Sequence, residues 1–265
     1  MIFSSLNLKS KPRDEQPIVV FILSFNRPLY LWVCLDSLFR HTGYPAKFVI
    51  ADNHSSDPLV AEVIRGFERR RMFHQVYMCD ENRPDRLDWM MRQHRHEVGD
   101  MFAFIESDVE VLPSPNGWLR TMRDLMYKHP KMWLLGSRCE RNDFIEPELA
   151  KRVDPTLSDE QLTFLIKKNS PERMEVDCRP PLIEPHNPPG RLLLMRTALL
   201  DAIRITTDLA LYNDVKRLGY EAKISTEVRH RHLSLLNFFD YADYDHDLRN
   251  RFMTAIRTGS SEAIM

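Results

Sequence analysis

Glycine is scarce in this chain, which removes the commonest sequence devices for holding a phosphate. Only 8 of the 265 residues are glycine, and neither G-x-G-x-x-G nor G-x-x-x-x-G-K-[ST] occurs. Those motifs wrap backbone N–H groups around a dinucleotide or a nucleoside triphosphate. The sequence therefore supports neither a dinucleotide-binding fold of the usual kind nor a P-loop, and any phosphate must be held in another way.

Cysteine pairs, excess charge and long apolar runs are absent as well. The four cysteines form no C-x-x-C pair, which argues against zinc and dithiol chemistry. The formal net charge is −1, so no basic field favours nucleic acid as a partner. No apolar run approaches the roughly 20 residues of a membrane span, and residues 1–17 lack the apolar segment of a signal peptide. We therefore expect a cytoplasmic protein with no nucleic-acid partner.

Strand and helix patterns alternate over the first hundred residues. The expected strands are residues 18–23, 48–51, 76–79 and 101–105, and the expected helices begin at Pro28, Pro58 and Pro84. Proline suits the first turn of a helix, and Asp57 is a good N-cap for the second one. The alternation predicts an α/β fold with a central, mostly parallel sheet flanked by helices.

The second half of the chain is less regular. Its expected elements are helices over 118–126 and 208–218, the latter ended by Gly219, and strands over 132–135, 191–195, 222–224 and 228–232. From Cys139 to Pro189 the chain is polar and proline-rich, with one helix expected after Ser158. An insertion of this length is typical of a lid or recognition loop. The expected organisation is a polar lead-in (1–16), a domain in two halves (17–137 and 138–235) and a C-terminal helical tail (236–265).

Two carboxylates follow the fourth expected strand. Glu106, Ser107 and Asp108 come directly after the apolar run at residues 101–105. While the chain stays extended, residues two apart point to the same side. The carboxyl end of a strand is where an open α/β sheet binds ligands, and hard oxygen ligands suit Mg²⁺ or Mn²⁺ carrying phosphates. The alternative is a strand end capped by solvated acids.

The order of four motifs resembles the family-2 inverting glycosyltransferases of the GT-A fold. The motifs are Ser24-Phe25-Asn26-Arg27-Pro28, Asp52-Asn53-His54-Ser55-Ser56-Asp57, Phe104-Ile105-Glu106-Ser107-Asp108-Val109, and Thr207-Asp208 leading through a helix to Gly219-Tyr220. His230 and His232 follow where the family usually has a metal-binding histidine. The likeness covers about residues 17 to 235. It implies a GT-A (Rossmann-like) fold with an irregular acceptor-side insertion.

The chain also departs from the family pattern. Glu106 replaces the usual first Asp of the metal motif, Thr207 replaces the usual Glu before the catalytic Asp, and Ala210 stands where many members carry a further acid. The Q-x-x-R-W motif of processive polysaccharide synthases is absent. The resemblance therefore implies transfer of one or a few sugars, from a UDP-, GDP- or dTDP-sugar to a hydroxyl of a glycan or lipid-linked acceptor, in a setting such as polysaccharide biosynthesis.

The resemblance also implies residue roles. Asp208 would be the general base, although a helix N-cap is the structural alternative. Asp108, Glu106 and one of the two histidines would hold the metal, with Mn²⁺ favoured over Mg²⁺ because imidazole is a ligand. The sequence leaves open which histidine binds, and the other would be a surface residue. The donor-binding set is Ser24, Asn26, Arg27, Asp52, Asn53, Arg83, Arg86 and Ser107; for the two arginines after the third strand, a solvated helix start is the alternative.

Three questions stay open from the sequence. A sugar-phosphate nucleotidyltransferase shares this architecture, but usually carries a glycine-rich motif where this chain has Ser24-Phe25-Asn26-Arg27. A non-catalytic nucleotide-sugar or glycan-binding module is the other class. The tail from residue 236 combines aromatic residues, acids and arginines. We expect it to pack on the domain, and a peripheral contact with the inner face of the membrane is the alternative.

Overall fold

The structure is a computed structural model that describes residues 16–140, 180–185 and 188–233, together with 151, 155, 156, 158 and 159. Two expectations lie outside the described residues: the C-terminal tail from residue 236, and nearly all of the irregular insertion with its helix after Ser158. Within the described residues, no helix is long and apolar enough to cross a membrane.

The first four strands form a parallel sheet, as the alternation predicted. They are β1 (Ile18–Ser24), β2 (Ala46–Asp52), β3 (Phe73–Met78) and β4 (Met101–Glu106), in the order β3-β2-β1-β4. The helices between them are α1 (Pro28–His41), α2 (Pro58–Arg69) and α3 (Arg86–Gln93). The side chain of Asp57 caps α2 by accepting from the Leu59 N–H. The third helix begins two residues after Pro84, which lies in the preceding turn.

The second half adds antiparallel strands to the same sheet. Its elements are β5 (Val109–Val111), α4 (Trp118–Lys128), β6 (Met132–Cys139), β7 (Leu182–Ile183), β8 (Leu192–Arg196), α7 (Ala198–Ala202), α8 (Asp208–Arg217) and β9 (Glu221–His232). Among the described residues the sheet continues from β4 through β8, β6 and β9 to β5, with β7 beside β9. β8 runs antiparallel to both β4 and β6, whereas β9 is parallel to β6. The α/β fold is confirmed, with a mixed sheet in its second half.

The last strand is one long element where the sequence suggested two. Its pairing with β6 shifts register: Ser137 pairs with Ser225, and the next residue, Arg138, pairs with Arg229. Such an irregularity bends a strand without ending it. β9 can therefore leave β6 and continue alongside β5, which carries its last residue, His232, to the end of β4.

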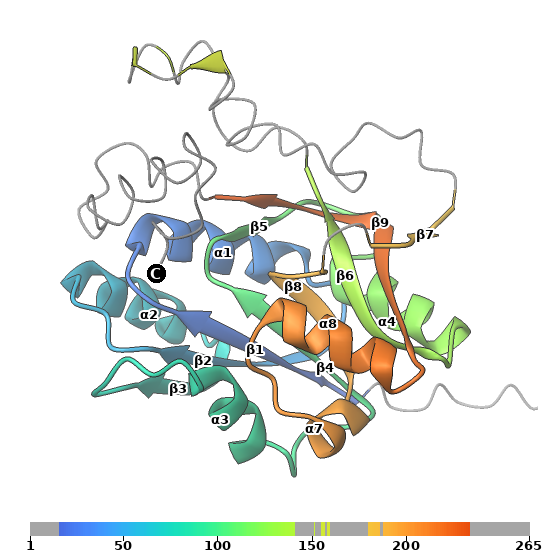
Figure 1. Cartoon of the computed structure of the whole chain (residues 1–265). Coiled ribbons are helices and arrows are strands. Elements are labelled where there is room, and N and C mark those ends of the chain that lie inside the picture. The colour runs from blue at the N-terminus through green and yellow to red at the C-terminus, as the bar shows by residue number, and fades with distance from the viewer. Residues whose placement is uncertain are drawn as a thin grey trace, which may run out of the picture.

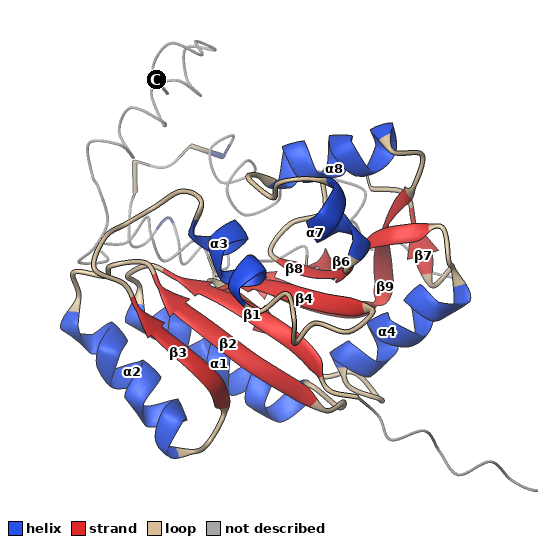
Figure 2. Cartoon of the chain, turned by 90° about the horizontal axis from the view of Figure 1, so that it is seen from below, coloured by secondary structure: helices blue, strands red, loops and turns tan. Residues whose placement is uncertain are grey.

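Helices cover both faces of the sheet (Figures 1 and 2). On one face, α1, α2 and α4 pack against alternate strand residues such as Val20 and Ile22. On the other face, α3, α7 and α8 pack against the intervening residues, such as Val19 and Phe21. Successive strand residues point to opposite faces, so a strand buried on both sides must be apolar throughout. This explains the continuous apolar runs in β1 and β4.

Glu97 ties three elements together at the amino-terminal edge of the sheet. Its carboxylate accepts from Lys47 Nζ of β2 at 2.9 Å, and lies 2.8 Å from His94 Nδ1 and 2.7 Å from His74 Nε2. The hydrogen bond from Lys47, with help from the two histidines, lowers the pKa of Glu97 to about 2. The carboxylate is therefore held in its charged form by the folded protein.

We expect Glu97→Gln to destabilise the protein at neutral pH by on the order of 1 kcal/mol, allowing for solvent screening. A lowered pKa contributes stability above the unfolded value of 4.5, and that stability is lost as the pH falls towards 2. Urea unfolding at pH values between neutral and about 2 should show the two proteins converging in acid. Glu62→Gln, which removes an exposed pair with Arg65, is the control and should change little. A difference that stays constant across this range would contradict the assignment.

Candidate active site

The carboxyl ends of three parallel strands meet at one edge of the sheet. In the β1–β2 register Ser24 pairs with Asp52, and in the β1–β4 register Leu23 pairs with Glu106. The chain order reverses beside β1, since β2 and β3 lie on one side of it and β4 on the other. Ligands bind at such a point in open α/β sheets. The motifs that are far apart in sequence are thereby brought to one place.

The acidic triplet turns back at this edge. β4 ends at Glu106, Ser107 and Asp108 form a turn, and β5 begins at Val109. The chain therefore does not stay extended through Asp108, contrary to the expectation from period two. Asp108 Oδ2 lies 3.1 Å from His232 Nε2 and 3.5 Å from Arg27 Nη1. Asp108 Oδ1 is buried and has no hydrogen-bond partner among the described residues.

The two histidines of β9 are both buried, so neither is the surface residue that the sequence allowed for. They share a face of the strand, as their spacing predicted, and alternate with exposed arginines. Their contacts differ. His232, paired with Val109 across β5, reaches the carboxylate of Asp108, whereas His230 Nδ1 lies 2.7 Å from Ser137 Oγ. The geometry therefore places His232, and not His230, beside the acidic triplet.

The pKa values of the two carboxylates of the triplet are shifted in opposite directions. Burial and the charge of Asp108 raise the pKa of Glu106. Burial also opposes ionisation of Asp108, but the hydrogen bond and charge of His232, with Arg191 and Arg27, lower its pKa overall. The Glu106 side chain is 45% exposed, so its pKa is raised mainly by the negative charge of Asp108. Two neighbouring carboxylates oppose each other's ionisation, and nearby positive charge relieves this repulsion.

Arg191 is a site residue that the sequence analysis missed. Its backbone is left-handed, with φ 66°, and its carbonyl accepts from the Glu106 N–H at 2.8 Å. Its Nε lies 3.9 Å from Glu106 Oε2. The sequence showed only the start of an apolar strand at this position. Its place directly after Pro-Pro-Gly, where the chain re-enters the sheet, was the available signal for an unusual backbone.

The Asp208 carboxylate lies against Gly190, the residue directly before this arginine. A Cβ atom on Gly190 would stand 3.2 Å from Asp208 Oδ2, so the absent side chain leaves room for the carboxylate. The charge of Asp208 contributes to the raised pKa of Glu106. The N-cap of α8 is Thr207, whose side chain accepts from the Ala210 N–H. Asp208 is therefore not the capping residue, and its exposed carboxylate bonds only to the adjacent Leu209 N–H among the described residues.

The motif after β1 is hydrogen-bonded to the motif after β2. Asn26 has a left-handed backbone with φ 53°, and its Oδ1 accepts from the Ser56 and Asp57 N–H groups at 2.8 and 3.3 Å. Asp52 accepts from both the N–H and the hydroxyl of Ser55. These contacts tie the β1–α1 loop to the β2–α2 loop. Of the residues expected to bind the donor, Asn26 and Asp52 thus already carry internal hydrogen bonds.

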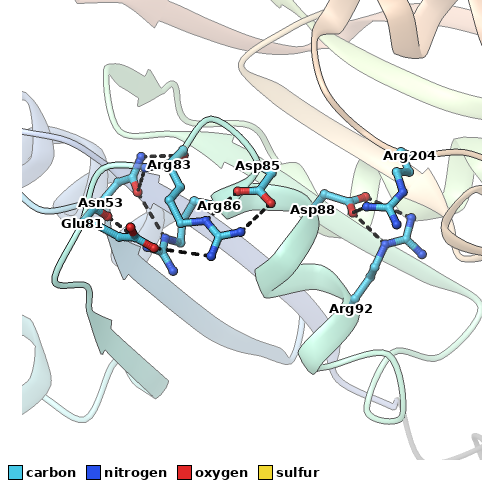
Figure 3. Close-up of polar contacts among 8 residues, drawn as sticks. All are labelled: Asn53, Glu81, Arg83, Asp85, Arg86, Asp88, Arg92 and Arg204. Atoms are coloured by element: carbon cyan, nitrogen blue, oxygen red, sulfur yellow. Dashed lines mark hydrogen bonds and ion pairs between the residues drawn. The ribbon is translucent and has the colours of Figure 1, made fainter.

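Asn53 makes the next connection, to the loop that precedes α3 (Figure 3). Its Oδ1 accepts from the Arg83 N–H and from Arg86 Nε at 3.0 and 3.2 Å, and its Nδ2 donates to Asn82 and to the Arg83 carbonyl. Arg86 is buried and donates also to the Glu81 carbonyl. The Arg83 guanidinium is exposed and pairs with Asp85 and Glu81. Arg86 thus anchors the loop, and only Arg83 faces solvent.

The triplet and His232 have the donor chemistry of a divalent-metal site. Hard carboxylate oxygens with an imidazole suit Mn²⁺, and the buried, unpartnered Asp108 Oδ1 is aimed at no other described group. Within the described residues, no group of three His, Cys, Asp or Glu side chains is placed so that it could hold a metal ion by itself. The side chains of the triplet and His232 offer suitable donor atoms, and a complete set of ligands would need further groups.

A mixed sheet of this order, with an acidic turn after its fourth strand, defines the GT-A glycosyltransferase fold. The family model described as "Glycosyl transferase family 2" matches residues 19–186, more than half of the chain, and the chain therefore belongs to glycosyl transferase family 2. A comparison with curated proteins found no match.

Solved structures with the same fold are distant in sequence. GalNAc-T7, solved with UDP, GalNAc and Mn²⁺, is 12% identical with a TM-score of 0.52, over 83% of this chain and 44% of that one. The S. aureus TarS fragment is 14% identical with a TM-score of 0.52, covering 89% and 69%. The mannosyltransferase PcManGT from Pyrobaculum calidifontis, solved with GDP-Man and Mn²⁺, is 14% identical with a TM-score of 0.51, covering 94% and 69%. This chain thus spans less than half of the GalNAc-T7 chain, and the likeness establishes the fold.

We expect Asn26→Ala to destabilise the fold by about 2 kcal/mol, since the Ser56 and Asp57 N–H groups lose their acceptor and alanine tolerates a left-handed backbone poorly. Asn26→Asp keeps an acceptor oxygen and a residue type that adopts this backbone, so it should cost much less. Urea unfolding of the two variants beside wild type measures both. Equal stability of the alanine variant and wild type would show that Asn26 does not hold the two loops together.

Proposed function

We propose that this chain is a metal-dependent, inverting glycosyltransferase that moves a sugar from a nucleotide-sugar donor to a hydroxyl of a glycan or lipid-linked acceptor. The observation that carries this proposal is the convergence of two separate acidic motifs. Glu106 bonds to the Arg191 backbone, and Asp208 packs on Gly190 immediately before it. The proposed metal-binding acid and the proposed base thus both contact one short segment, residues 190–191.

The donor half is formed by the ends of β1 and β2. Asp52 is fixed by Ser55, and a fixed carboxylate is a good acceptor for a base N–H or a ribose hydroxyl. Ser24, whose buried Oγ has no hydrogen-bond partner among the described residues, sits beside it in register. The related structures with UDP and with GDP-Man support a nucleotide-sugar donor. The choice among UDP-, GDP- and dTDP-sugars stays open.

Asp108, Glu106 and His232 are the residues that would hold the metal, with Mn²⁺ preferred because of the imidazole. When bound, a divalent ion neutralises charge on the diphosphate that departs. Arg27 and Arg191 approach the same two carboxylates. Their guanidinium groups would also suit the diphosphate oxygens of the donor, for which arginine has a suitable geometry.

Asp208 would take the proton from the acceptor hydroxyl. Thr207 supplies the helix cap, which leaves the Asp208 carboxylate exposed at the start of α8. A single base opposite the leaving group gives inversion in one step. The acceptor would be bound by the segment from about 140 to 190, which lies between the metal motif and the base in sequence and mostly outside the described residues.

Metal binding can be tested without turnover. We expect Asp108→Ala to abolish the Mn²⁺-dependent part of UDP, GDP or dTDP binding in calorimetric titrations, because the buried oxygens that face the cation are removed. Glu110→Gln, on the adjoining strand and paired with Arg231, is the matched control and should bind normally. Retention of metal-dependent binding by the alanine variant, with its fold intact, would reject the metal site.

The base can be tested by removing charge alone. Asp208→Asn should leave nucleotide binding nearly intact and slow transfer by ~10²-fold or more, the usual scale for a general base. Asp214→Asn on the same helix, which breaks a surface pair with Arg217, is the control. The product anomer, read by NMR, should be inverted relative to the donor. Undiminished turnover of the Asp208 variant, or a retained anomer, would refute the mechanism.

A further inference from the structure

An ion pair between a buried carboxylate and a partly exposed arginine, outside the proposed site, holds the segment that leads to Asp208. Asp88 and Arg92 lie one turn apart on α3 and pair in a bidentate manner, at 2.7 and 3.0 Å. The Asp88 side chain is only 6% exposed. A carboxylate so buried requires partners, since an unpaired buried charge is costly. Figure 3 shows the pair beside Arg204, whose guanidinium lies 4.0 Å from Asp88.

The partners of this pair lie on the backbone of α7 and of the segment that joins α7 to α8. Arg92 donates to the Leu200 and Ile203 carbonyls at 2.9 and 3.0 Å, and Asp88 accepts from the Ile205 N–H at 3.1 Å. Residues 203–207 have no regular secondary structure. Two side chains of α3 thus satisfy two polar backbone groups of the short irregular segment that leads to Asp208, and one carbonyl of α7.

The amino-terminal end of the same helix is fixed at the proposed donor site. Arg86, its first residue, bonds to Asn53, which directly follows Asp52. The buried Met90 and Met91 fix the helix on the sheet, in the same apolar cluster as Ile203 and Ile205. α3 therefore spans from the ends of the donor-binding strands to the segment that carries the proposed base.

We propose that Asp88, acting with Arg92, is a positioning residue for Asp208: it sets the place of the proposed base relative to the donor-binding strand ends. This inference rests on the proposed function. Asp88 is not among the residues proposed to bind substrate or metal, and its effect passes through the backbone at Ile205. A displacement of about 1 Å in a reacting group can cost 10²-fold in rate, so the hydrogen bonds that fix the backbone at Ile203 and Ile205 have a direct consequence for turnover.

A second ion pair, close to the first, joins the connection after α3 to α7 and provides a matched control. Arg95 of the α3–β4 connection pairs with Asp201 of α7 at 2.8 Å, on the surface. It does not contact residues 203–207 through any described hydrogen bond. Asp201→Asn thus removes a carboxylate from the same neighbourhood and leaves the segment before Asp208 bonded as before.

The test compares Asp88→Asn, Arg92→Lys and Asp201→Asn in the wild-type and Asp208→Asn backgrounds. The measurements are release of nucleoside diphosphate from UDP-, GDP- and dTDP-sugars with Mn²⁺, the binding of UDP, GDP and dTDP with Mn²⁺, and amide exchange over residues 200–212. We expect Asp88→Asn and Arg92→Lys to lower kcat by about 10- to 100-fold, to leave nucleotide affinity unchanged and to speed amide exchange at residues 203–209. In the Asp208→Asn background these two substitutions should not lower kcat further. Asp201→Asn should leave kcat, nucleotide affinity and amide exchange unchanged in both backgrounds.

The outcomes distinguish the positioning role of Asp88 from the proposed role of Asp208 as the base. If Asp208→Asn slows release but Asp88→Asn and Arg92→Lys behave like Asp201→Asn, positioning is refuted and the proposed base stands. An equal loss in both backgrounds, or a matching loss of nucleotide affinity, would mean general damage to the fold and also refutes it. If Asp208→Asn itself retains full turnover, the proposed function fails instead. Arg92→Lys keeps the charge next to Asp88, so the test survives if Asp88→Asn does not fold.

Discussion

The register of β1 between β2 and β4 is the constraint on which the rest of the structure depends. It sets Ser24 level with Asp52 and Leu23 level with Glu106, so that polar chain ends leave the sheet at one edge. A slip by one residue would move every side chain of a strand to the opposite face of the sheet, where it would meet a different set of packed side chains. The apolar faces of α1 and α3 on opposite sides of β1 hold that register. The location of the proposed site is thus a consequence of core packing.

Charge at this edge is balanced with few groups. Glu106, Asp108 and Asp208 bring three carboxylates together, and Arg27, Arg191 and His232 are the positive or protonatable groups that face them. Arg27 and Arg191 both have left-handed backbones, a conformation that costs free energy in residues other than glycine. Such strain is tolerated where the surrounding contacts fix it, here at a helix start and at the carbonyl that accepts from Glu106. The acids and arginines are held at separations of 3.5 to 3.9 Å, without close hydrogen bonds between them, which leaves both open to a cation and an anion.

Two asparagine side chains join the irregular loops at this edge of the sheet. Asn26 joins the first two loops, and Asn53 joins the second loop to the third. Each side chain offers an acceptor and donors, so it can satisfy several backbone groups of an irregular loop at once. A separate group of polar contacts, that of Asp88 and Arg92, lies further along α3 and bonds to the segment before Asp208 (Figure 3). The loops on the donor side and the segment before Asp208 are therefore both bonded to α3.

The sequence by itself determined the local elements and the acidic residues at their ends. The apolar runs gave the four parallel strands, Pro28 and Asp57-Pro58 gave the helix starts, and the motif order gave the fold family. It could not determine which distant groups meet. The tertiary structure decided four such contacts. β8 runs antiparallel beside β4, and β9 bends so that His232, and not His230, reaches Asp108. Arg191 approaches Glu106, and Asn26 and Arg86 make hydrogen bonds to neighbouring loops. The physical reason is that periodicity along a chain reports only which face of an element is buried. Contacts between separate elements depend on strand register, bulges and backbone turns, and these follow from the packing of the whole molecule.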